Sequence, residues 1–140
     1  MTSMSEAERE AFLAVPRLGM LSTLRTDGSP VTVPVWFEWD GKALRVFAGA
    51  GSGKISRLQR DPRASLLVPN SMGERESWVA FDGEFTITTE GAFALAERLA
   101  HRYWEMTRPE YRAMVDTWRA GEAELRVLTM MPRRIRASLE

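Results

Sequence analysis

A glycine-rich turn at residues 49–54, Gly-Ala-Gly-Ser-Gly-Lys, is the segment whose residue types point most directly to chemistry. It precedes a segment, 55–60, that we expect to be helical, so free backbone N–H groups and the helix dipole favour a bound anion. Ser52 adds a hydroxyl and Lys54 a positive charge, and Arg57 lies one turn further along. The turn is not a Walker A loop, because the first glycine and the hydroxyl residue after the lysine are missing. A plain connection between two elements is the alternative interpretation.

Aromatic residues on two neighbouring expected strands form a second candidate surface: Trp36, Phe37, Trp39 and Phe47. Side chains alternate along a strand, so Trp36 faces one side of the sheet, and Phe37 and Trp39 face the other. Packing in a barrel core explains this set by itself. The functional alternative is a planar ligand lying against residues 33–35, where Pro34 lacks an N–H and leaves nearby backbone groups facing the ligand. Because proline cannot donate to a strand ladder, Pro34 also indicates an edge position, with a bulge as the alternative.

The remaining reactive side chains do not assemble into a catalytic set. His101 is the one histidine, and a lone helical histidine is typical of a surface or packing position. The glutamates at positions 6, 8 and 10 are most simply a solvated helix face, and no pair of carboxylates has a spacing that requires acid–base catalysis. The arginines at 133, 134 and 136 are expected to form a solvated C-terminus rather than a phosphate contact. No catalytic residue is assigned.

Composition excludes several kinds of chemistry. The chain has 140 residues, no cysteine and one histidine, which removes disulfides, thiolate catalysis, cysteine-ligated zinc, iron–sulfur clusters and multi-histidine metal sites. We therefore expect no metal site. A bound organic cofactor becomes the leading source of reactivity.

Charge and length narrow the class of protein further. Nineteen basic and nineteen acidic side chains balance, which argues against a general nucleic-acid binder. The N-terminal sequence does not resemble a signal peptide, and no apolar stretch approaches the roughly 18 residues of a membrane span. We expect a cytoplasmic protein that makes no contact with nucleic acid or membrane. The length suits one domain over residues 1–140.

Turn residues and apolar patterns place the elements. Asp27-Gly28 and Asp40-Gly41 are tight-turn signals, so the first strands form an antiparallel meander. Strands are expected over 19–24, 31–39, 43–48, 64–68, 77–89 and 124–130, the fifth interrupted by a bulge at Asp82-Gly83. Helices are expected over 6–15, 55–60, 92–104 and 109–118, the first beginning with a Ser5–Glu8 capping box. This order predicts a mainly β (α+β) domain, a small β-barrel with peripheral helices.

Two sequence blocks carry a resemblance to a known family. The block Leu-x-Thr-x-x-x-Asp-Gly-x-Pro, followed by Pro-Val-Trp-Phe, covers 21–37, and Lys-x-x-x-Leu-x-Arg-Asp-Pro-Arg-Ala-Ser covers 54–65. Together they resemble the flavin and deazaflavin oxidoreductase superfamily, which is built on the split β-barrel of pyridoxamine 5′-phosphate oxidase. The resemblance is good over about residues 11 to 90.

That resemblance implies a homodimer with two cofactor sites in the subunit interface. In relatives the strand matching 32–35 lies along the cofactor ring, the next strand approaches it, and a serine and a lysine bind the phosphate. The matching residues here are Thr32, Val33, Pro34, Val35, Phe47, Ala48, Ser52, Gly53 and Lys54, and Trp78 matches a polar residue near the ring.

Differences from pyridoxamine 5′-phosphate oxidase indicate which cofactor and which kind of substrate to expect. That enzyme has arginines at the positions of Thr32 and Gly53 and a lysine at Phe37, so this chain does not resemble a true pyridoxamine phosphate oxidase. The lysine-only phosphate motif is more similar to the actinobacterial branch that uses the deazaflavin F420. The resemblance implies hydride transfer from F420 to a small unsaturated or electron-poor substrate. An FMN-dependent oxidoreductase or flavin reductase, and a non-catalytic cofactor- or haem-binding split barrel, are the alternatives.

Overall fold

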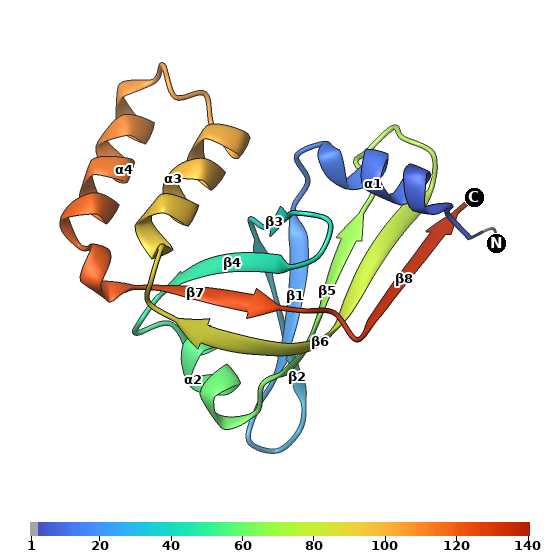
Figure 1. Ribbon diagram of the computed structural model, residues 1–140, viewed down its shortest axis with the longest axis horizontal. Helices are drawn as coiled ribbons and strands as arrows, with labels where there is room; N and C mark the ends of the chain where they lie inside the picture. Colours follow the sequence, from blue (N-terminus) through green and yellow to red (C-terminus); the bar gives the residue numbers. More distant parts are fainter. Residues whose placement is uncertain (1–2) are drawn as a thin grey trace.

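The computed structural model describes residues 3–140 as a curled antiparallel sheet of eight strands with four α-helices (Figure 1). The first two residues of the expected range 1–140 lie outside the described residues. In chain order the elements are α1 (Glu6–Ala14), β1 (Gly19–Leu24), β2 (Pro30–Val35), β3 (Glu38–Trp39), β4 (Leu44–Gly49), α2 (Gly53–Arg60), β5 (Arg63–Pro69), β6 (Ser77–Thr88), α3 (Ala92–Tyr103), α4 (Pro109–Ala120), a 3₁₀ turn (Glu122–Glu124), β7 (Leu125–Met130) and β8 (Arg134–Leu139). The expected mainly β barrel with peripheral helices is confirmed.

Only Trp36 and Phe37 separate β2 from β3, although these strands lie at opposite ends of the order β2-β1-β5-β6-β7-β4-β3. In a flat sheet the six steps between them would measure roughly 29 Å at about 4.8 Å per step. The three Cα steps from Val35 to Glu38 reach about 11 Å at most. The sheet must therefore curl until its two ends come close together.

The expected single strand over 31–39 is wrong for this reason. β2 pairs with β1, whereas Glu38 and Trp39 pair with β4. Phe37, between them, is fully buried in the core, so the chain leaves one sheet end and crosses to the other with this ring turned inward. Because β2 pairs with β1 alone, the expected edge position of Pro34 is confirmed.

The long strand β6 joins the two halves of the sheet. Its first half pairs with β8 and its last four residues pair with β7, so the strand changes partner near Gly83. The expected bulge at Asp82-Gly83 is wrong, because the register with β5 runs without a break from Trp78 to Glu84. A side chain at residue 83 would nevertheless fit tightly, since a Cβ at Gly83 would lie 3.0 Å from the Cγ of the fully buried Met130.

The C-terminal residues are not a solvated tail, which corrects the sequence-based expectation. Residues 134–139 form β8, which pairs with β6. Ile135 and Ala137 pack against the main core, while Arg136 donates to both carboxylate oxygens of Asp82 at 2.7 and 3.0 Å. The three arginines obscured the alternation of apolar and polar residues that is typical of a strand.

Local signals at the chain's turns and first helix are confirmed. The Ser5–Glu8 capping box is present, with each side chain accepting from the other residue's N–H at 3.0 and 2.9 Å. Gly28 and Gly41 have φ of 85° and 91°, a left-handed conformation that glycine adopts without strain. Within residues 3–140, no helix is long and apolar enough to cross a membrane.

Phe81→Ala is expected to lower the free energy of unfolding by about 3–5 kcal/mol, because a fully buried phenyl ring leaves a cavity. The ring packs against Trp39 at a centroid distance of 4.8 Å. Urea unfolding followed by tryptophan fluorescence measures the change. Thr88→Ala, an exposed position on the same strand, should change it by less than about 0.5 kcal/mol. Similar small effects of both substitutions would contradict the assigned core.

Candidate functional site

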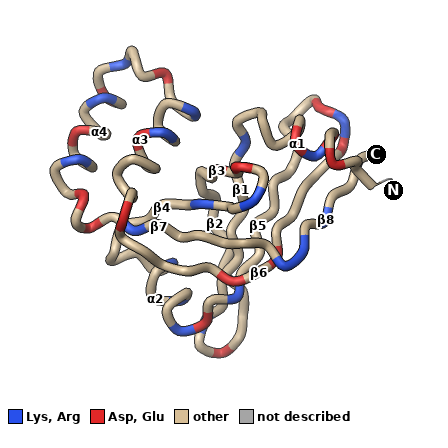
Figure 2. The backbone as a smooth tube through the Cα atoms, viewed as in Figure 1, with Lys and Arg blue, Asp and Glu red and all other residues tan. Residues whose placement is uncertain are grey.

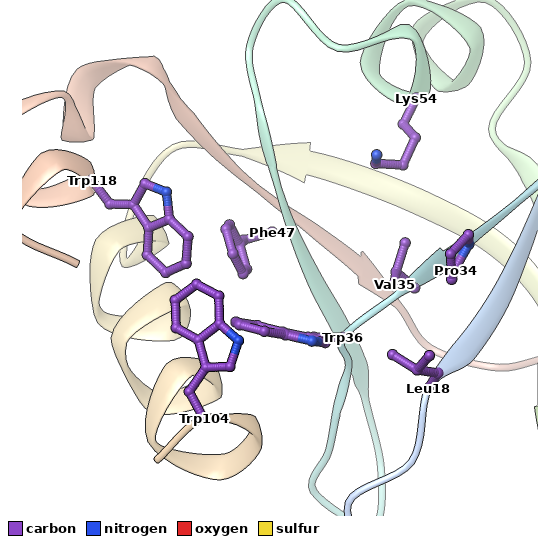
Figure 3. A pocket seen from close by; sticks show the side chains of 8 residues that line it. All are labelled: Leu18, Pro34, Val35, Trp36, Phe47, Lys54, Trp104 and Trp118. Carbon is purple, nitrogen blue, oxygen red and sulfur yellow. The ribbon is translucent and has the colours of Figure 1, made fainter. Parts of the chain in front are cut away.

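A cleft of about 450 Å³ lies between the start of α2, the edge strand β2 and the helical pair α3 and α4 (Figure 3). Its lining residues are Leu18, Pro34, Val35, Trp36, Phe47, Lys54, Trp104 and Trp118. Four residues predicted from the sequence, Pro34, Val35, Phe47 and Lys54, are thus brought together. Lys54 lies at one end of the cleft, and Trp104 and Trp118 at the other, so the cleft has a cationic end and an aromatic end.

Other predicted residues of these strands lie next to the cleft without lining it. Thr32 is exposed, and its hydroxyl lies 2.8 Å from that of Ser22 on β1. Val33 packs against the main core, and Ala48 is buried within it. The side chains of Val33 and Ala48 are turned into the core, so these two residues can offer only their backbones to a ligand in the cleft.

Ser52 and Gly53 stand beside Lys54 at the start of α2, and their surroundings fit a phosphate. The Oγ of Ser52 is buried and has no hydrogen-bond partner among the described residues. The N–H groups of a first helical turn also lack intrahelical acceptors. A phosphate there would accept from this hydroxyl and from the amides and would benefit from the helix dipole.

Lys54 is the single ionisable residue among the eight that line the cleft. Burial lowers the pKa of its ammonium group, and the nearby positive charge of Arg57 lowers the pKa further. Both effects disfavour the charged amine, and an anion bound beside it would oppose both. The charged amine of Lys54 therefore has no negative charge beside it among the residues that line the cleft.

Three of the chain's five tryptophans form the aromatic end. The Trp36 ring lies edge-on to Trp104, with centroids 4.7 Å apart, and Trp104 stacks on Trp118 at 5.6 Å. Trp104 and Trp118 were not predicted as site residues, because the sequence of residues 104–123 did not indicate which of its side chains would face a ligand. Their occurrence at the ends of two consecutive helices was the available signal.

Tyr103 holds this wall in place. Its ring stacks on Trp36 at 5.1 Å with an interplanar angle of 1°, and its hydroxyl donates to the backbone oxygen of Arg17 at 2.6 Å. Burial raises the pKa of the Tyr103 hydroxyl, which therefore stays protonated as a donor. The contact ties α3 to the segment that leads to Leu18, a lining residue on the other side of the cleft.

Trp78, also predicted, lies outside this cleft. It lines a second cavity of about 390 Å³ with residues of β8 and of the N-terminal segment. The Arg136 guanidinium lies 5.8 Å from the Trp78 ring centroid. The buried Oγ of Ser138, which also lines this cavity, has no partner among the described residues.

His101 takes no part in either cavity. It is exposed on α3, with Nδ1 3.0 Å from the backbone oxygen of Glu97, and lines a different hollow beside α4. Among residues 3–140, no three or more histidine, aspartate or glutamate side chains gather as a metal site would require.

One face of the sheet connects the cleft to the Trp78 cavity. Pro34, Met20, Leu67 and Ala80 are directly paired across four neighbouring strands and therefore share this face. Trp78, two residues before Ala80, lies on it as well. Leu67 is 39% exposed at its centre, whereas α1 and α2 bury their apolar side chains in the core on the opposite side.

Comparison with known proteins fits this geometry. The family model of pyridoxamine 5′-phosphate oxidase matches residues 5–137, nearly the whole chain. The chain belongs to this family. The split barrel expected from the sequence is the family's fold, and the cleft lies on the strands where the resemblance places the cofactor ring.

The family's reductases are among the similar proteins. An F420H(2)-dependent biliverdin reductase of Mycobacterium tuberculosis is 36% identical over 109 residues, covering 75% of this chain and 76% of that protein. Among solved structures, an F420 reductase has a TM-score of 0.73 and 24% identity, covering 90% of this chain and 94% of that one. A conserved hypothetical protein of Mycobacterium tuberculosis has a TM-score of 0.78 and 28% identity, covering 97% and 85%. The family and these relatives indicate a flavin- or deazaflavin-type oxidoreductase.

The structure shows the setting of two positions at which this chain differs from the expected pattern of pyridoxamine 5′-phosphate oxidase. Phe37 is fully buried, so its position cannot present a cation to a ligand. Thr32 points its hydroxyl at Ser22. In this chain the cation that lines the cleft is Lys54, at the start of α2.

Tyr103→Phe is expected to lower the free energy of unfolding by about 1–3 kcal/mol, because the backbone oxygen of Arg17 loses its buried donor. Tyr111→Phe is the matched control, since its ring also stacks on a cleft tryptophan but no hydrogen bond of its hydroxyl is found among the described residues. Urea unfolding should show almost no change for the control. An equal effect of the two would refute the positioning role of Tyr103.

Proposed function

We propose that this protein is an F420-dependent reductase that binds the cofactor in its cleft and passes hydride to a small unsaturated or electron-poor organic molecule. The observation that carries the proposal is the asymmetry of the cleft, with a half-buried Lys54 at one end and a wall of aromatic rings at the other. Such a cleft suits a molecule with a flat ring system and a phosphate. The similarity to an F420H(2)-dependent reductase favours the deazaflavin.

The chain's own contribution is to bind, orient and exclude water. Lys54, the Ser52 hydroxyl and the first amides of α2 would hold the phosphate. The outer edge of β2, which pairs with β1 on its other side, offers backbone groups of residues 32–35 to the ring. Phe47 and Trp36 close the apolar side. Bound there, the cofactor would supply the hydride.

Among the described residues, no side chain that lines the cleft is placed to act as a general acid. Among the residues lining the cleft only Lys54 ionises, and it lies at the phosphate end. We infer that solvent supplies any proton that the acceptor needs. This agrees with a reaction whose reactivity belongs to the cofactor.

A haem-binding role has less support. The chain's one histidine is exposed on α3 and lies outside the cleft, so an iron bound in the cleft would find no imidazole.

Figure 2 shows basic and acidic residues interspersed over the elements, as in a protein that binds neither nucleic acid nor anionic lipid through a broad basic face. We propose a cytoplasmic enzyme.

We further propose that two copies pair through the sheet face that carries Met20 and Leu67. Its apolar centre adjoins the cleft at Pro34 and the second cavity at Trp78. A twofold arrangement would stack this face on its copy and bring Trp78 of one protomer towards the cleft of the other. This would give Trp78 the place near the ring that the sequence resemblance implies.

Lys54→Ala should weaken binding of F420 about 10- to 100-fold, the cost of one lost charge-assisted hydrogen bond to phosphate. Titration of F420 and FMN side by side, followed by the quenching of tryptophan fluorescence, measures the affinities. Lys42→Ala removes the only other lysine, which is exposed on a turn, and should bind like the parent. A parent that binds FMN more tightly than F420 would make it an FMN enzyme, and one that binds neither would overturn the proposal.

Leu67→Asp should separate the protomers and weaken cofactor binding with them, because a carboxylate on an apolar face is costly to bury. Met114→Asp alters an equally exposed apolar residue, 44% against 39%, on α4 away from this face. Light scattering should give a dimer for the parent and the control and a monomer for Leu67→Asp. A dimer that survives Leu67→Asp would place the interface elsewhere.

A further inference from the structure

Arg57 lies on α2 behind Lys54, and in the site described so far it acts only through its effect on the pKa of Lys54. The Arg57 side chain runs back along the helix towards Gly53, and a Cβ at Gly53 would lie 2.8 Å from its Nη1 and 3.6 Å from its Cζ. The guanidinium therefore lies directly over the first residue of the helix, where a side chain on Gly53 would otherwise be.

A buried threonine fixes this position. The Nε of Arg57 donates to the Oγ1 of Thr23 on β1 at 2.7 Å, and Thr23 is 1% exposed. Within residues 3–140 this is the one hydrogen bond of the Arg57 side chain, so its two terminal nitrogens can bind another group. Their planar fork matches two oxygens of one phosphate.

The guanidinium has no carboxylate to neutralise it. Arginines such as Arg45, Arg98 and Arg136 form ion pairs with acidic side chains, but none is found for Arg57 or Lys54 among the described residues. The two cations are close enough for the charge of Arg57 to act on Lys54. Two like charges at one helix start, next to the unpartnered Oγ of Ser52, favour a bound phosphate group.

We propose that Arg57 is the second phosphate-binding cation of the cofactor site, and that Thr23 and Gly53 position it. The inference rests on the proposed function, since it assigns a residue to the same cofactor's phosphate. It also predicts that a methyl group on residue 53 would displace the guanidinium from the helix start. The site thus selects cofactors that carry a phosphate over the same ring without one.

The test compares each cofactor with a form that lacks the phosphate: FMN with riboflavin, which differ by the phosphate alone, and F420 with its ribityl deazaflavin core, which lacks the phosphate and the group attached through it. Arg57→Gln should weaken binding of the phosphorylated form about tenfold or more and leave binding of the phosphate-free form unchanged. Thr23→Val should weaken binding of the phosphorylated form less than Arg57→Gln does, because the guanidinium is still present but loses its hydrogen bond to Thr23. Gly53→Ala should weaken binding of the phosphorylated form as Arg57→Gln does, even though alanine stabilises a helix relative to glycine.

Arg60→Gln is the matched control, because Arg60 lies on the same helix and donates to a backbone oxygen of β1 without facing Gly53. It should bind both forms like the parent. Thermal melting of each variant without cofactor checks that the fold is intact. If the parent shows the preference for phosphate and Arg57→Gln keeps it, the inference fails while the proposed function stands. If the parent binds neither F420 nor FMN, both fail together.

Discussion

The two-residue connection between β2 and β3 is the constraint on which the rest of the structure depends. It joins the two ends of the strand order over a distance that only a curled sheet allows. Phe37 anchors the connection in the core, while Trp36, which points the other way, packs against α3. These two residues thus have two effects: they hold the ends of the sheet together, and they turn one aromatic ring towards the helices.

The cleft follows from that closure. Curling the sheet sets the edge of β2 beside β4 and the start of α2, so that Pro34, Phe47 and Lys54 line one hollow. The helices α3 and α4 then complete it with two tryptophans. Each part offers little alone: an edge strand, a helix start and an aromatic wall form the proposed cofactor site only when the barrel places them together.

Local signals in the sequence predicted the parts that depend on neighbouring residues. The capping box, the Asp-Gly turns and the edge position of Pro34 have local causes and were correct. The break at residues 36–37 and the strand β8 were missed, because both depend on partners far along the chain. The placement of Arg57 over Gly53 depends on Thr23, a residue more than thirty positions away, which spacing within α2 does not indicate.

Native mass spectrometry of the purified chain with F420 tests the central claim most directly, because it reports the number of chains and of cofactors in one complex. We predict two chains with two molecules of F420, and loss of F420 from the complex when Lys54 and Arg57 are both replaced by glutamine. A single chain that carries no cofactor in the presence of excess F420 and FMN would contradict the account.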